Sequence, residues 1–280
     1  MDDVHQDIRY GAASAQLLDV YPGPPGGPTI VWAHGGGWIG GSKVDIGGYF
    51  AELARAGFNV VGFDYTLAPE ALYPTPVREM LEAIAFIAAK KDEFRLAPDK
   101  LILGGDSAGA NIAAQAALAL VDASYSEELG TSRITRNLHT AGARPVATAL
   151  QCGVYDARMM REATGSFAAV VRDMVTAYCG TAQWADDERS AFARESVLGN
   201  VSGDFPPTFI SAGNNDDLTP QSKALAAKLT EHGVEVSALF FSRSARPRTG
   251  HEYQFDLSSK AGARNLSQMT EFLLACAARG

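Results

Sequence analysis

Cysteine is scarce in this sequence: Cys152, Cys179 and Cys276 are the only three among 280 residues. They are odd in number and widely spaced, which excludes a fully paired disulfide framework. No close cluster of cysteine and histidine has the spacing of a zinc site. We therefore expect three buried free thiols in a reducing compartment, and no metal.

Long apolar runs and an excess of positive charge are also missing. No apolar run approaches the roughly 20 residues that a helix needs to span a bilayer. The run MDDVHQDIRY at the start lacks the basic region and apolar stretch of a secretory signal, so we expect a cytoplasmic protein without a membrane span. A formal net charge of −8 argues against a nucleic-acid partner, because such a surface needs a basic face.

The sequence does have ample apolar material in a regular arrangement. Hydrophobic residues make up 46% of the chain, enough to bury a large core, and a single domain over residues 1–280 is ordinary at this length. Short apolar runs that end at turn residues predict strands at 29–34, 58–65, 101–106, 146–153, 207–214 and 234–241. Helical spacing predicts helices at 76–91, 108–120, 220–232 and 263–278.

This alternation of strand and helix predicts an α/β fold. Its expected form is a mostly parallel central sheet with helices on both faces. The runs DIRY and AQLLDVY, which precede the first of those strands and flank a polar turn, predict an opening hairpin.

Residues 156–204 break the alternation, because they contain two helical stretches and no good strand. An apolar stripe at helical spacing runs through Phe167, Val170, Val171, Met174, Val175 and Tyr178. Such a stripe usually packs against a core. Since the segment falls between two predicted strands, we expect a small helical lid, inserted late in the sheet, that covers its C-terminal edge.

The run GDSAG at 105–109 fits the pattern G-x-S-x-G, directly after a predicted strand and before a predicted helix. There the serine sits on a sharp, strained turn whose neighbours must be small, because strand and helix crowd together. The following helix places its positive end near developing negative charge. Ser107 is therefore the candidate nucleophile; the alternative is a glycine-rich structural turn.

The run HGGGW at 34–38 ends the first long predicted strand. Consecutive glycines let backbone N–H groups approach a substrate closely, and such a motif supplies an oxyanion hole upstream of a G-x-S-x-G serine. We expect the amides of Gly36, Gly37 and Ala108 to hold the oxyanion. Trp38 either walls the substrate pocket or packs beneath the loop.

A serine nucleophile needs a base, and the base needs an acid to orient it. Among the five histidines, His251 follows the last predicted strand, and the order serine, acid, histidine fits a triad on such a sheet. Asp216, just past a predicted strand, is the preferred acid. Asp217 beside it could instead cap the following helix, and Asp156 is a further candidate.

Together these motifs resemble the α/β-hydrolase superfamily, and within it the hormone-sensitive-lipase-like esterases, in which HGGGW, DYTLAPE and GDSAG occur in this order. The resemblance implies an α/β-hydrolase fold and a serine carboxylesterase that hydrolyses short-chain acyl esters through an acyl-enzyme, without a cofactor. In that family the acid begins a D-P-L pattern. Here Asp216-Asp217-Leu218 has Asp where Pro is usual.

Two other functions stay open. The HGGxW pattern also resembles kynurenine-formamidase-like hydrolases, which would use the same triad on an N-formyl amide. A non-catalytic ligand-binding homologue is the third hypothesis, and the presence of Ser107, Asp216 and His251 argues against it.

Arginines gather just before the candidate base, in the run SRSARPRTG. We interpret Arg243, Arg246 and Arg248 as a solvated loop; the alternative is that one of them meets an anionic group of the substrate. The expected partner is a small-molecule ester. The last predicted strand and helix could also pair two copies into a homodimer.

Overall fold

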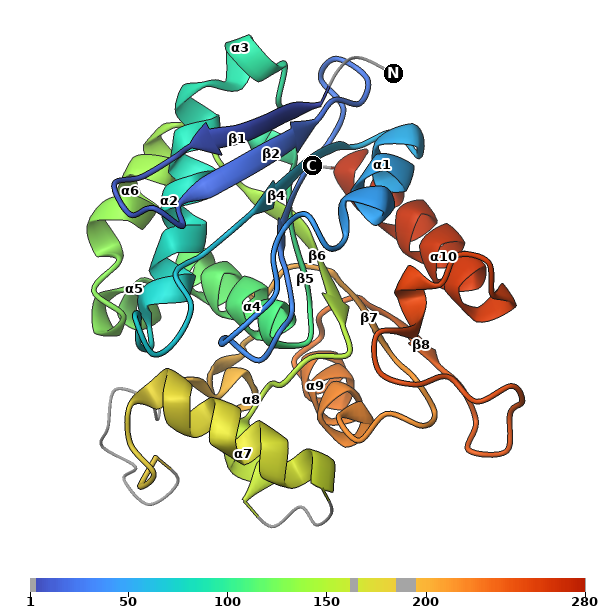
Figure 1. Ribbon diagram of the computed structural model, residues 1–280. Helices are drawn as coiled ribbons and strands as arrows, with labels where there is room; N and C mark the ends of the chain where they lie inside the picture. Colours follow the sequence, from blue (N-terminus) through green and yellow to red (C-terminus); the bar gives the residue numbers. More distant parts are fainter. Residues whose placement is uncertain (1–3, 162–165, 185–194, 280) are drawn as a thin grey trace.

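An eight-stranded sheet runs through the molecule (Figure 1), in the order β1-β2-β4-β3-β5-β6-β7-β8. The computed structural model describes residues 4–161, 166–184 and 195–279. The strands are β1 (His5–Arg9), β2 (Leu17–Tyr21), β3 (Thr29–Ala33), β4 (Asn59–Phe63), β5 (Leu101–Asp106), β6 (Pro145–Gln151), β7 (Thr208–Ala212) and β8 (Val236–Phe240). Strands β3 to β8 are parallel, and β1 and β2 pair antiparallel. The predicted parallel sheet and opening hairpin are confirmed.

Four long helices match the sequence prediction to within a few residues: α2 (Thr75–Ala89), α4 (Ala108–Val121), α9 (Thr219–Glu231) and α10 (Lys260–Ala277). The sequence pattern missed α1 (Gly47–Arg55), α5 (Ala123–Glu128) and α6 (Ser132–Thr140). Short elements complete the chain: α3 (Lys91–Phe94), η1 (Pro98–Lys100), η2 (Ala157–Met160), α8 (Val197–Asn200) and η4 (Tyr253–Phe255). Within the described residues, no helix has the length and apolar character to cross a membrane.

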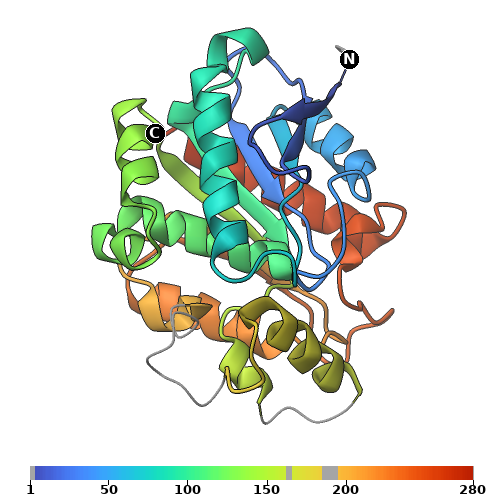
Figure 2. The same ribbon diagram turned by 60° about the vertical axis from the view of Figure 1, so that its left-hand side comes forward.

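Two cores lie on opposite faces of the sheet, because successive strand residues point in opposite directions. In β3, Val31 and Ala33 belong to the core that α2, α4 and α9 cover. Ile30 and Trp32 belong to the core that α1 and α10 cover. Figure 2 shows α2 crossing the near face while α1 and α10 lie behind the sheet.

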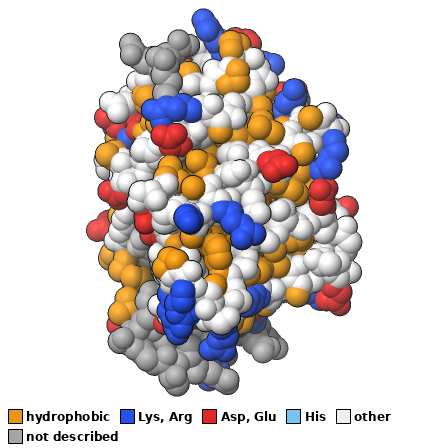
Figure 3. Space-filling view, turned by 90° about the vertical axis from the view of Figure 1, so that its right-hand side faces the viewer, with side chains coloured by type: hydrophobic (Ala, Val, Ile, Leu, Met, Phe, Trp, Pro, Cys, Tyr) orange, Lys and Arg blue, Asp and Glu red, His pale blue; other side chains and the backbone are white. Residues whose placement is uncertain are grey.

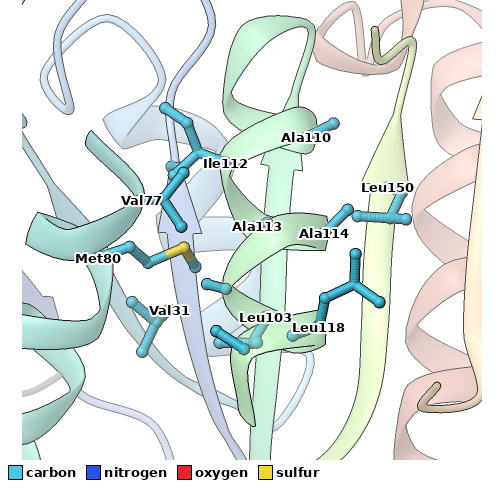
Figure 4. Close-up of a cluster of buried hydrophobic side chains, with 14 of the residues drawn as sticks. Val31, Val77, Met80, Leu103, Ala110, Ile112, Ala113, Ala114, Leu118 and Leu150 are labelled. Atoms are coloured by element: carbon cyan, nitrogen blue, oxygen red, sulfur yellow. The ribbon is translucent and has the colours of Figure 1, made fainter. Parts of the chain in front are cut away.

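Helix α4 lies against the centre of the sheet with small side chains. Figure 4 shows Ala110, Ala113 and Ala114 in the same buried cluster as Leu103 of β5 and Leu150 of β6. Alanine keeps the helix axis close to the strands. As a result, α4 packs closely against the strand that precedes it, β5.

The segment 156–204 contributes η2, α7 (Ser166–Cys179) and α8, which lie beyond the carboxyl ends of the parallel strands (Figures 1 and 2). Val171, Val175 and Tyr178 of the predicted stripe are buried, but Val170 is 47% exposed. The side chain of Phe167 lies outside the described residues. The buried face of α7 is therefore narrower than the stripe predicts, and a lid function for the segment stays a prediction.

The edge strand β8 and helix α10 border a shallow depression of about 440 Å³ on one side of the molecule. Figure 3 shows this side, where groups of hydrophobic side chains alternate with scattered charged ones. A homodimer through the last strand and helix would use this face, and it stays a prediction.

A buried cation ties the loop after β3 to the opening hairpin. The Nζ atom of Lys43 lies 2.8 Å from Asp7 Oδ1 and 2.9 Å from Asp19 Oδ1, and the Lys43 backbone N–H donates to Asp64 Oδ1 at 2.7 Å. The side chains of Lys43 and Asp19 are buried. The Asp19 carboxylate therefore depends on Lys43 for its counter-charge.

We expect Lys43→Met to lower the free energy of unfolding by about 3 kcal/mol, because it leaves the buried Asp19 carboxylate without a cation. Urea denaturation at neutral pH measures the change. Lys90→Met is the matched control: Lys90 pairs with Glu93 at an exposed i,i+3 position, where such a pair contributes roughly 0.5 kcal/mol or less. Equal losses in the two variants would contradict the prediction.

Candidate active site

Ser107 lies on the turn between β5 and α4. Its φ of 51° and ψ of −120° form a conformation that a non-glycine residue adopts only at an energetic cost. The glycines on either side of Ser107 have no room for a side chain. A Cβ atom at Gly105 would lie 2.3 Å from the carbonyl oxygen of Gly109, and a Cβ atom at Gly109 would lie 2.0 Å from the carbonyl oxygen of Ala33. The close approach of strand and helix therefore requires both glycines.

Ser107, His251 and Asp216 form a hydrogen-bonded line. Ser107 Oγ lies 3.0 Å from His251 Nε2, and His251 Nδ1 lies 3.0 Å from Asp216 Oδ2. Asp216 is buried, and its Oδ1 accepts a hydrogen bond from the backbone N–H of Leu218 at 2.9 Å. The three residues follow β5, β7 and β8, whose carboxyl ends meet at one edge of the sheet.

The other two candidate acids lie elsewhere. Asp217 is exposed, and it does not cap α9, whose first turn has no side-chain cap. Asp156 accepts hydrogen bonds from Arg158 Nε at 3.0 Å and from Ser196 Oγ at 2.9 Å. Of the three carboxylates, Asp216 is the one that contacts the imidazole.

The environment of His251 makes its imidazole more basic. Burial alone would lower its pKa, but the hydrogen bond and charge of Asp216, together with the charge of Glu252, raise the pKa above its ordinary value.

The glycine loop after β3 is held in a left-handed conformation. The φ values are 108° at Gly36 and 62° at Gly37, which favour glycine. The Gly36 carbonyl oxygen accepts a hydrogen bond from the backbone N–H of Gly40 at 3.0 Å. Behind the loop, the His34 ring stacks on Tyr65 with centroids 4.4 Å apart, and the Tyr65 hydroxyl donates to the His34 carbonyl oxygen.

A pocket of about 240 Å³ opens beside Ser107. One end is lined by residues of the glycine loop, of the serine turn and of the loop that carries the base, namely Gly36, Gly37, Ser107, Ala108, His251 and Glu252. Its other walls are apolar and are formed by Trp38, Val154, Val171, Met174 and Leu218. Val171 and Met174 belong to α7. The glycine motif, the serine turn and the base, all singled out in the sequence, therefore meet around one cavity.

Trp38 lines the pocket and also packs against α7. It borders the cavity beside Ser107, it is only 1% exposed, and its ring stacks on Tyr178 of α7 with centroids 4.7 Å apart. It therefore joins the glycine loop to the segment that lies over the site. A contact between Trp38 and substrate stays a prediction.

The arginines before His251 stay outside the pocket. Arg243, Arg246 and Arg248 are exposed, and none of them is among the described residues that line the cavity. Arg248 Nη1 donates to Asn215 Oδ1 at 2.6 Å. This placement supports the interpretation of a solvated loop.

Sequence reasoning did not place Cys152, which follows β6, beside the triad. Its thiol lies within 4.8 Å of ligand atoms of Asp216 and His251, a donor set that resembles a metal site. However, Asp216 and His251 already contact each other, and burial raises the pKa of the thiol well above its ordinary value, which keeps it protonated. These contacts favour a neutral thiol beside the triad. Cys152 and Cys276 are buried as predicted, but Cys179 is only partly buried.

Comparison with known proteins identifies the family. A family model described as the alpha/beta hydrolase fold matches residues 30–245. The chain belongs to this family. The predicted α/β-hydrolase fold and the motif resemblance to this family are thereby confirmed.

Curated relatives of this chain include acetyl esterases from Salmonella paratyphi B and Salmonella typhi, each 28% identical over 227 residues. The match covers 80% of this chain but 65% of each relative, so the chain spans less than two-thirds of their length. Among solved structures, esterase B from Lactobacillus rhamnosis has a TM-score of 0.83 at 24% identity, covering 99% of this chain and 87% of that one. Esterase LipW from Mycobacterium marinum has a TM-score of 0.75 at 23% identity, and the match covers 98% of this chain and 82% of that one. At these identities the structures show a shared fold.

Proposed function

We propose that this hydrolase is a serine carboxylesterase that cleaves short-chain acyl esters through an acyl-enzyme. The observation that carries the proposal is the hydrogen-bonded line from Ser107 through His251 to Asp216, which opens on a pocket bordered by glycine amides. The names of its relatives, acetyl esterase and esterase B, support the same reaction class.

In the proposed mechanism, Ser107 Oγ attacks the ester carbonyl carbon while His251 Nε2 accepts the serine proton. Asp216 keeps the other imidazole proton on Nδ1 and stabilises the imidazolium. The amides of Gly36, Gly37 and Ala108 bind the oxyanion. The imidazolium then donates its proton to the leaving alcohol oxygen as the C–O bond breaks, and water repeats the sequence on the acylated serine.

The size of the pocket supports a short acyl group. Pockets for drug-sized ligands occupy about 300–1,000 Å³, whereas this one is about 240 Å³. Met174 also closes over the glycine loop, since a Cβ at Gly37 would lie 2.2 Å from its sulfur. Val171 and Met174 of α7 line this pocket, so a long acyl chain would meet that helix.

Hydrolysis of a p-nitrophenyl ester series from acetate to dodecanoate, with N-formylkynurenine assayed alongside, tests the function. We expect the highest kcat/KM for acetate to butyrate. Turnover of the formamide alone would instead identify an arylformamidase that uses the same residues. If no substrate is hydrolysed and a fluorophosphonate does not label Ser107, the protein is a ligand-binding homologue.

The pH dependence should show the basicity of His251. The imidazole must be neutral to accept the serine proton, and its pKa is raised. We therefore expect kcat/KM to fall tenfold per pH unit on the acid side, with the midpoint above about pH 6.5, the ordinary histidine value. A pH series with a short neutral ester measures it. A midpoint well below pH 6.5 would contradict the predicted effect of Asp216.

A further inference from the structure

A second pair of carboxyl groups lies beside the triad. Asp106 directly precedes the nucleophile and is 2% exposed. Its two carboxyl oxygens accept hydrogen bonds from Trp32 Nε1 and from the Gly35 backbone N–H, each at 2.8 Å. Glu252 directly follows the base, and 34% of its side chain is exposed.

The two carboxyl groups meet above Gly35. A Cβ on Gly35 would lie 2.4 Å from Asp106 Oδ2 and 2.7 Å from Glu252 Oε1, so the two carboxyl oxygens face the same small space. Two carboxylates that share a site repel each other, which favours one proton and one negative charge on the pair.

The proton belongs on Asp106 and the charge on Glu252. Burial, and then the charge of Glu252, raise the pKa of Asp106 well above its ordinary value. The Glu252 side chain reaches water and lines the pocket, where a charge is less costly. No lysine or arginine is found among the described residues that line the pocket, so no side-chain cation there offsets this carboxylate.

Glu252 also lies beside the atom that would protonate the leaving group. Its Oε1 is 3.7 Å from His251 Nε2, the atom that protonates the leaving oxygen in the proposed mechanism. A cationic group two carbons beyond that oxygen can therefore reach the carboxylate. The other carboxyl groups near His251 are Asp216, on its Nδ1 side, and the protonated Asp106.

We propose that Glu252, which lines the pocket beside His251, is a specificity-determining residue that makes the pocket favour esters whose alcohol carries a cationic group. The proposal rests on the proposed esterase function and adds a substrate class to it. The cation and the Glu252 carboxylate would lie about 5 Å apart, in a site whose polarity is intermediate between that of water and that of a protein interior. Their attraction then corresponds to roughly a tenfold preference in kcat/KM.

Two acetate esters of nearly the same shape test this. Acetylcholine carries a quaternary ammonium, and 3,3-dimethylbutyl acetate has a neutral carbon in its place. We expect the ratio of their kcat/KM values to exceed one in the wild type and to fall about tenfold in Glu252→Gln. Asp217→Asn is the matched control, because it removes one negative charge from an exposed residue outside the pocket lining, and it should leave the ratio unchanged.

Circular dichroism and thermal melting verify that each variant is folded. A wild-type ratio below one overturns the proposal without reference to any variant. The proposal is also overturned if the kcat/KM ratio of the two acetate esters is the same in the wild type and in Glu252→Gln. If p-nitrophenyl acetate is still hydrolysed in that case, the esterase function is unaffected. If the wild type hydrolyses none of the three esters, the esterase function and this proposal fail together.

Discussion

Replacing Ser107 with Ala is expected to lower kcat/KM for p-nitrophenyl acetate by roughly 10⁵-fold or more. The variant retains the pocket and the glycine amides but has no oxygen to form the acyl-enzyme. The 3.0 Å contact between Ser107 Oγ and His251 Nε2 makes this hydroxyl the one that the base can activate. Release of p-nitrophenolate, followed at saturating and at low ester concentration, measures the loss.

Ser244→Ala provides the control for the serine variant. Ser244 lies in the exposed loop before His251, so its removal should leave the rate within about twofold of the wild type. A Ser107→Ala protein that keeps more than a few per cent of wild-type activity, after contaminating esterases are excluded, would show that the nucleophile is another group.

Asp216→Asn is expected to lower kcat by roughly 10³- to 10⁴-fold. An asparagine amide would donate a hydrogen bond to His251 Nδ1, which forces the imidazole proton onto Nε2. The base could then no longer accept the proton of Ser107. The variant should still bind ester with a similar KM, because Asp216 is buried and does not line the pocket.

Asp217→Asn distinguishes the two neighbouring carboxylates of the run NNDDL. Asp217 is exposed and contributes neither to the triad nor to a helix cap, so its variant should keep activity within about twofold. Steady-state kinetics of both variants on one neutral ester make the comparison. A larger loss in Asp217→Asn than in Asp216→Asn would reverse the assignment of the acid.

The sequence predicted the sheet better than it predicted the helices. Buried parallel strands are nearly continuous apolar runs, so β3 to β8 were recognisable from local composition. Helix α1 was not, because it begins with Gly47 and Gly48 and has no capping side chain. Its stability comes from Tyr49, Phe50 and Leu53, which pack into the core on one face of the sheet, and no local pattern reveals that packing.

By itself, the sequence determined the order of the strands along the chain and the residues that could act as nucleophile, oxyanion donors and base. Those features depend on steric demands of only a few consecutive residues, such as the glycines around Ser107. Only the tertiary structure placed Asp216, and not Asp217, against His251, and only it brought Glu252 near Asp106. Such contacts join residues that are far apart in the chain. Their distances depend on how β5, β7 and β8 are aligned in the sheet, and the spacing of residues along the chain does not determine that alignment.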